Sequence, residues 1–275
     1  MTGVRIDYHT HTARCRHASG TMREYLEAAC ARGIAELAFT DHIPMTHPVL
    51  APSCMAEAEL DGYVAEVLRL KEEFAGRIRV KLGIEADFVA GQEHCVATLL
   101  AAHPFDVVLG SVHVMDDWGI DNDLYLEYYR AGNIEEIFSR YFEHLALAAR
   151  TGLFDIIAHP DVVKKFNYLP ARADYSDLFA GAVDAIAASG MAIEINAGGF
   201  RRPVGEQYPG RAFLRRCLDR GVPLVTGSDA HTPAEVGADF DRVYALLAEE
   251  GVTGLATFTR RRRGVITLAG QGVPA

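Results

Sequence analysis

The sequence predicts an α/β fold in which seven strand–helix units form a barrel, one strand short of the eight in a TIM barrel. Short apolar runs alternate with segments of helical periodicity from residue 4 to residue 247. Each helix then serves as the crossover that neighbouring parallel strands require. Polar residues follow most of the predicted strands, as expected where parallel strands end at a functional face. A doubly wound open sheet is the alternative, although no Gly-x-Gly-x-x-Gly pattern follows the first strand.

The composition limits the possible functions. The chain has 275 residues, of which 49% are hydrophobic, enough for one α/β barrel or two small domains. A net charge of −10 argues against a nucleic-acid partner that relies on a basic surface. No apolar run reaches the length of a membrane span, and a strand that starts at Val4 leaves no room for a signal peptide. Five cysteines favour reduced thiols and a cytoplasmic location.

Local signals bound the elements in the first half of the chain. Thr21 and Glu24 form a capping-box pattern that starts a helix, and Gly33 is suited to end it. A second helix carries apolar residues at helical spacing from Leu60 and ends at Gly76. We expect strands at residues 4–6, 37–40, 78–84 and 106–110, and a further helix at 92–102.

The second half follows the same alternation. Asn133, followed by two glutamates, begins a helix that ends at Gly152. We expect strands at 154–158, 191–196 and 223–226, and helices at 175–189, 213–218 and 240–247. The basic run 260–263 is expected to be solvated or to pack against acidic surface, with an anionic partner as the alternative.

Candidate metal ligands lie at the ends of six of the seven predicted strands. His9 and His11 are two apart on an extended backbone, so their side chains point to the same side. Any one ligand could be a core or capping residue, but seven of the eleven histidines fall at or just beyond strand ends. Metal coordination by imidazole accounts for such a set. Its members are His9, His11, His17, His42, Glu85, His113, His159, Asp229 and His231.

Nine ligands exceed the requirement of one ion, because zinc takes about four. The set therefore predicts two or three ions with a carboxylate shared between two of them. Glu85 is the expected bridge, since it comes from a central strand and carboxylates bridge more readily than imidazoles.

At this point the sequence resembles the PHP superfamily, named for polymerase and histidinol phosphatase. The resemblance runs from Asp7 to His231 and implies a distorted (β/α)7 TIM-like barrel, forming one metallophosphatase domain over residues 1–275. It also implies three divalent ions (zinc, iron or manganese). The motifs that carry it are His-x-His, His17, Asp-His, Ile-Glu-Ala, Ser-Val-His, Ala-His-Pro-Asp and Ser-Asp-Ala-His.

The resemblance divides the ligands among the ions. His9, His11, Glu85 and Asp229 would hold the first. Glu85 would also hold the second, together with His113 and His159. The third would be held by His17, His42 and His231.

Three stretches look like the family members that hydrolyse L-histidinol phosphate in histidine biosynthesis. They are residues 83–87, residues 111–113 with the Asp-Trp-Gly-Ile-Asp that follows, and residues 194–199 leading to Arg201. The implied reaction is phosphomonoester hydrolysis, in which metal-activated hydroxide attacks phosphorus. Alternatives are a phosphodiesterase or nucleotidase acting on nucleotides or short oligonucleotides, and a metal-binding module without catalysis.

Substrate-binding residues are expected near the ligands. Lys164 and Arg201 resemble family positions that hold phosphate, and Arg can bind phosphate bidentately. The neighbouring Lys165 and Arg202 compete for these roles, and the sequence does not separate the members of either pair. The expected substrate is a small phosphate ester, with neither nucleic acid nor membrane as partner, and the oligomeric state is not indicated.

Other acidic and aromatic residues have two interpretations each. Asp41 could orient His42 or act in catalysis beside Glu85 by protonating the leaving alkoxide. Asp121 could pair with a substrate ammonium or imidazolium, or be a solvated loop charge. Trp118 could cover the substrate imidazole or simply pack.

Overall fold

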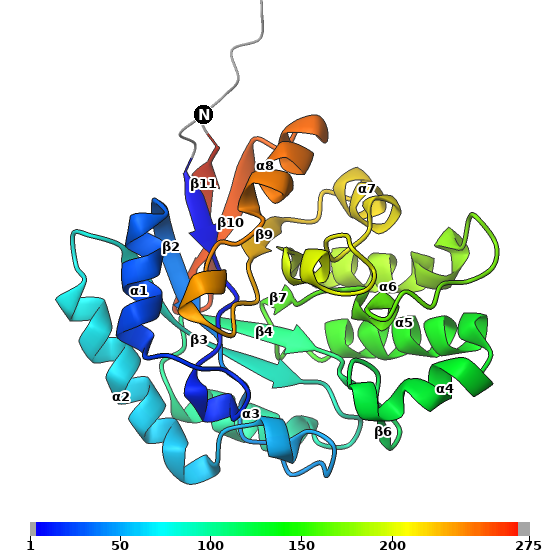
Figure 1. The fold of residues 1–275 in the computed structure, drawn as a ribbon, viewed down its shortest axis with the longest axis horizontal. Coiled ribbons are helices and arrows are strands. Elements are labelled where there is room, and N and C mark those ends of the chain that lie inside the picture. The colour runs from blue at the N-terminus through cyan, green and yellow to red at the C-terminus, as the bar shows by residue number, and fades with distance from the viewer. Residues whose placement is uncertain (1–3, 269–275) are drawn as a thin grey trace, which may run out of the picture.

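A computed structural model describes residues 4–268 and shows a single parallel sheet of seven strands that curls into a nearly closed barrel (Figure 1). The order in the sheet follows the order in the chain, which confirms the predicted fold class. Boundaries differ by a few residues, and the strand expected at 154–158 is regular only at Ile156–Ile157. The strands are β1 (Arg5–Asp7), β2 (Ile34–Phe39), β3 (Arg79–Asp87), β4 (Val107–Ser111), β7 (Ile156–Ile157), β8 (Ala192–Asn196) and β9 (Leu224–Gly227).

Helices surround the strands (Figure 1). The capping box at Thr21 forms as predicted: the Glu24 amide donates to Thr21 Oγ1, and the Thr21 amide donates to Glu24 Oε2. Across the described residues, no helix combines the length and apolar character needed to cross a membrane. The helices are α1 (Met22–Ala31), α2 (Glu57–Glu73), α3 (Glu93–Ala102), the unexpected short α4 (Leu126–Ala131), α5 (Ile134–Arg150), α6 (Ser176–Ser189), α7 (Arg211–Asp219) and α8 (Phe240–Glu249).

The barrel closes where β1 meets β9, along a boundary that we call the seam. The Tyr8 amide donates to the Thr226 carbonyl at 2.9 Å, and the His11 amide donates to the Ala230 carbonyl at 2.9 Å. Asp7 strengthens the junction, because its buried carboxylate accepts from the Ser228 hydroxyl at 2.6 Å. The seam therefore joins the first strand to the last one of the barrel.

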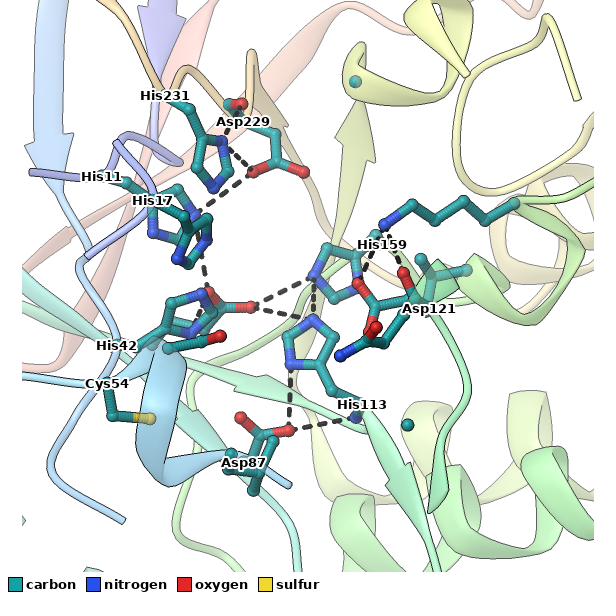
Figure 2. A pocket seen from close by; sticks show the side chains of 18 of the residues that line it. His11, His17, His42, Cys54, Asp87, His113, Asp121, His159, Asp229 and His231 are labelled. Atoms are coloured by element: carbon teal, nitrogen blue, oxygen red, sulfur yellow. Dashed lines mark hydrogen bonds and ion pairs between the residues drawn. The ribbon is translucent and has the colours of Figure 1, made fainter. Parts of the chain in front are cut away.

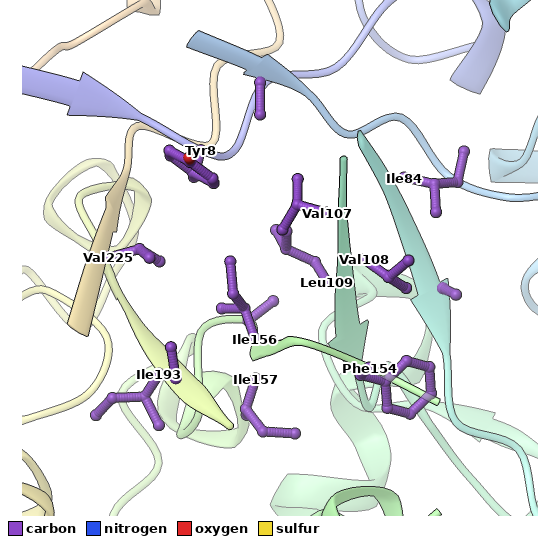
Figure 3. Close-up of a cluster of buried hydrophobic side chains, with 14 of the residues drawn as sticks. Tyr8, Ile84, Val107, Val108, Leu109, Phe154, Ile156, Ile157, Ile193 and Val225 are labelled. Carbon is purple, nitrogen blue, oxygen red and sulfur yellow. The ribbon is translucent and has the colours of Figure 1, made fainter. Parts of the chain in front are cut away.

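Apolar side chains from β4, β7 and β9 fill the barrel (Figure 3). Leu109, Ile156 and Val225 are all fully buried. Such branched side chains pack in layers inside barrels of parallel strands. This core leaves the carboxyl ends of the strands free to carry polar groups.

Two small antiparallel hairpins add to the barrel, and the sequence did not predict them. The first is β5 (Val114–Met115) with β6 (Trp118–Gly119), and the second is β10 (Gly254–Thr259) with β11 (Arg262–Thr267). The basic run 260–263 forms the turn of the second hairpin and the first residues of β11. Arg261 pairs with Asp155 at 3.0 Å, so part of the run packs against an acidic group.

Tyr8 ties the second hairpin to the barrel. Its buried hydroxyl donates to Glu36 and accepts from the Phe258 amide at 2.8 Å. We expect Tyr8→Phe to lower the free energy of unfolding by about 1–3 kcal/mol, because buried polar groups lose their partner. Urea denaturation would measure this, with Tyr128→Phe, at a half-exposed tyrosine, as the control. Equal stability of the two variants would contradict the expectation.

Candidate metal centre

A cavity of about 550 Å³ opens at the carboxyl ends of the strands, and eight of the nine predicted ligands line it. The ninth, His9, is fully buried behind them, with its Nε2 atom 3.1 Å from His11 Nε2. The loops after the strands bring the imidazoles toward one another (Figure 2). The eight are His11, His17, His42, Glu85, His113, His159, Asp229 and His231.

Glu85 lies at the centre of the ligand set. One of its carboxylate oxygens is 3.3 Å from His9 Nε2 and 3.1 Å from His42 Nδ1. The other oxygen is 3.1 Å from His159 Nε2 and 3.7 Å from His113 Nε2. A carboxylate whose two oxygens face different groups of imidazoles has the geometry to be shared between two ions.

Asp229 stands on the other side of the His9–His11 pair. Its Oδ1 atom is 3.2 Å from His11 Nε2 and 3.8 Å from His9 Nε2. The ring of His17 lies beside two further imidazoles, 4.8 Å from His231 and 5.5 Å from His42 between centroids.

Several ligand histidines are oriented through their second ring nitrogen. His9 Nδ1 is 2.9 Å from Glu194 Oε1, and His113 Nδ1 is 3.0 Å from Asp87 Oδ1. Gly227 makes room for the first contact, since a Cβ there would be 1.8 Å from Glu194 Oε1. Such partners fix the tautomer and the direction of a ligating imidazole.

Asp41 is buried beside two predicted ligands, His42 and His11. It accepts a hydrogen bond from the Thr12 hydroxyl and another, at 2.9 Å, from the His42 backbone amide. Its closest approach to an imidazole is 3.6 Å, to His11 Nδ1. Asp41 thus holds the backbone of His42 and faces the ring of His11, whose Nδ1 atom makes no hydrogen bond within the described residues.

Burial, carboxylates and neighbouring imidazoles shift the pKa values of the ligand histidines in different directions when no cation is bound. Burial lowers the pKa of His9, but Glu194, Glu85 and Asp229 together outweigh it and raise that pKa well above its usual value. Burial and the nearby His11 instead lower the pKa of His231 to about 3. A metal ion entering the site would displace protons, so metal binding should weaken in acid.

The donor set fits divalent cations. When the Nδ1 atoms of His9 and His113 donate to carboxylates, their Nε2 atoms carry lone pairs that point toward other predicted ligands. Those Nε2 atoms face His11 Nε2 at 3.1 Å and His159 Nε2 at 3.2 Å. Convergent nitrogen acceptors beside ionised carboxylates suit zinc, iron or manganese.

Two predicted ligands have an uncommon backbone conformation. The φ angle is +26° at His159 and +56° at Asp229. Positive φ is unfavourable for most residues with a side chain, and backbone strain of this kind occurs repeatedly at functional sites. The chain therefore holds both side chains at positions that a relaxed backbone would not give.

The structure places Lys164 and its neighbour Lys165 in different surroundings. Lys164 is 1% exposed and pairs with Asp161 at 2.9 Å and Glu206 at 2.6 Å. Its neighbour Lys165 lines the cavity and pairs with Asp121, which also lines it (Figure 2).

The two arginines separate in the same way. Arg201 donates to the Ser228 carbonyl at 2.6 Å and lies 3.3 Å from Asp239. Arg202 lines the cavity.

Trp118 is buried, stacks on Tyr128 with 4.7 Å between ring centroids, and lines a separate groove of about 240 Å³.

Two residues in the site were missed by the sequence analysis. Asp87 orients His113, and its position two residues after Glu85 on the same strand could have indicated this. Tyr208 lines the cavity from the loop between β8 and α7, and no motif marked it.

Known proteins are similar to this chain over most of its length. A family model described as the PHP domain matches residues 7–198. A probable histidinol-phosphatase of Deinococcus radiodurans is 43% identical over 240 residues, which are 87% of this chain and 91% of that protein. The histidinol-phosphatase of Bacillus subtilis is 30% identical over 258 residues, covering 86% of this chain and 96% of the relative.

A solved structure has the same fold. Histidinol phosphate phosphatase from Lactococcus lactis superposes with a TM-score of 0.80 at 22% identity. The match covers 94% of this chain and 98% of the other. That protein was solved in complex with zinc, L-histidinol and phosphate.

Proposed function

This chain belongs to the PHP domain family, and from that premise we propose that it is a histidinol-phosphatase, hydrolysing L-histidinol phosphate to L-histidinol and phosphate. The observation that carries the proposal is the cavity in which Glu85 faces imidazoles through both carboxylate oxygens. The relative that is 43% identical over 87% of the chain gives the substrate. Free thiols at all five cysteines agree with a cytoplasmic location.

Divalent metal ions are the cofactors that this site suits. We propose three of them, held by the nine ligands as the family resemblance divides them, with Glu85 shared by two. Bound ions supply positive charge for the phosphoryl oxygens and lower the pKa of a water toward neutrality. Zinc is the metal in the Lactococcus lactis protein, and iron and manganese suit the same donors.

The chain's own groups would position the ester. We propose Lys165 and Arg202 as the cations nearest the phosphate, since both line the cavity whereas Lys164 and Arg201 are engaged with other protein groups. Burial raises the pKa of Asp121, but Lys165 and His113 outweigh it and hold that pKa well below its usual value. Ionised Asp121 would pair with a cationic group of histidinol, which would replace Lys165 as its partner.

The leaving alkoxide must receive a proton. Asp41 is fully buried and already accepts from the Thr12 hydroxyl and the His42 amide, so we propose an orienting role for it. A water in the cavity would then deliver the proton.

The substrate assay tests the proposal directly. The metal-loaded protein should hydrolyse histidinol phosphate with a kcat/KM at least about 10³-fold above that for nucleoside 3′,5′-bisphosphates or single-stranded oligonucleotides, given the usual range for enzymes. Phosphate release measured on each substrate under identical metal conditions gives the comparison. Turnover of nucleotides or oligonucleotides without turnover of histidinol phosphate would support the nucleotidase alternative and contradict the proposed function.

A further inference from the structure

The hydroxyl of Tyr208 has no hydrogen-bond partner within the described residues, although the side chain is only 2% exposed. Buried tyrosine hydroxyls usually have a partner, because leaving one unpaired costs about 1–3 kcal/mol. Tyr208 also lines the cavity that holds His159 and Asp229. An unpaired buried donor beside a ligand cavity is explained when the ligand supplies the missing acceptor.

The surroundings hold Tyr208 in place. Its backbone pairs with Asn196 in both directions, at 2.7 Å and 3.0 Å. The ring is edge-on to His159, with 6.5 Å between centroids, and Lys164 Nζ is 5.6 Å from its centroid. A Cβ on Gly199 would be 3.0 Å from the ring, so the glycine allows the close backbone approach. The ring is thus fixed before any ligand enters.

The chemistry of the phenol selects an anionic ligand. A phenol of ordinary pKa near 10 is neutral at physiological pH and can donate its proton to an anionic oxygen. Arg202 lines the same cavity and comes from the same stretch of chain, six residues earlier. A hydroxyl donor and a guanidinium in one cavity form a suitable pair for a phosphoryl group.

We propose that Tyr208 is a substrate-binding residue whose hydroxyl donates a hydrogen bond to a phosphoryl oxygen of the ester. This inference rests on the proposed function, because it takes the bound anion to be a phosphate ester. It assigns Tyr208 a role in binding phosphate, either in the substrate or in the released product.

Tyr141 provides a matched control. Its hydroxyl is also buried and also lacks a partner among residues 4–268, but it lies on α5 and the cavity lining does not include it. Tyr208→Phe and Tyr141→Phe both remove an unpaired hydroxyl and keep the ring. We expect both variants to retain the metal content and a Tm equal to or slightly above that of the wild type.

Phosphate binding separates the two variants. Titration calorimetry of inorganic phosphate into the metal-loaded proteins should show binding to Tyr208→Phe weakened by roughly 10-fold or more, as for a lost hydrogen bond to a charged group. Its kcat/KM for histidinol phosphate should fall by a similar factor. Tyr141→Phe should match the wild type in both measurements.

Three results would overturn the inference. Tyr208→Phe could bind phosphate as tightly as the wild type, it could lose metal or stability and so show a structural role, or the wild type could fail to bind phosphate. The proposed function fails separately, when the wild type binds phosphate but does not hydrolyse histidinol phosphate. In that case the calorimetric comparison of the two variants still decides the role of Tyr208.

Discussion

Replacing Glu85 with alanine is expected to abolish phosphatase activity and to remove at least one bound metal ion. The carboxylate is fully buried and both of its oxygens face imidazoles, so no neighbouring residue can take its place. Removing a group that only orients a metal ligand costs about 10–100-fold, and Glu85 would itself contact the ions. We therefore expect a loss of activity well beyond 100-fold.

Metal analysis and phosphate release on the purified variants would measure both effects. Glu85→Gln keeps the size of the side chain but removes its charge, and should show the same loss. Glu143→Ala, at an exposed glutamate on α5, is the control and should behave as the wild type. Full metal content and full activity in Glu85→Ala would refute the bridging role.

Removing the metal ions is expected to lower the Tm substantially. Ligands come from both sides of the seam, His9 and His11 from one side and Asp229 and His231 from the other. An ion present at about 1,000 times its dissociation constant stabilises the folded state by about 4 kcal/mol, roughly 8 °C or more in Tm. Several ions would add to this.

Thermal unfolding of the metal-loaded and chelated protein at neutral pH gives the measurement. Glu85→Ala should show a smaller difference between the two states, because it binds fewer ions. Loss of activity on chelation without any change in Tm would mean that the ions do not contribute to holding the seam.

The fold and the convergence of the candidate metal ligands on one cavity could be predicted because each leaves a periodic signal. Strand ends recur along the chain, and a histidine or carboxylate at six of them indicates a common face. The short β7 and the β10–β11 hairpin were harder to foresee. β7 is regular over only two residues, and the hairpin contains a run of arginines that is typical of a solvent-exposed segment.

The substrate residues could not be resolved from sequence, for a geometric reason. Lys164 and Lys165 lie at the end of a single 3₁₀ turn, where consecutive side chains point about 120° apart. One therefore faces acidic groups beneath the loop while the other faces the cavity. Arg201 ends another 3₁₀ turn and Arg202 follows it in an extended conformation, so these two side chains also point in different directions. The role proposed for Tyr208 left no sequence signal, because it depends on a hydroxyl that has no partner among residues 4–268.

The seam also bears on how the chain folds. Tyr8 pairs with Thr226, so the last contact of the barrel forms between segments separated by most of the sequence. Closing so long a loop costs conformational entropy before the contact stabilises the chain, so the seam should form more slowly than the pairs of strands that are neighbours in sequence. Until residues 224–230 leave the ribosome, β1 has an exposed edge that can pair with another chain. Chains that lack β9 should therefore associate with one another more readily than complete chains.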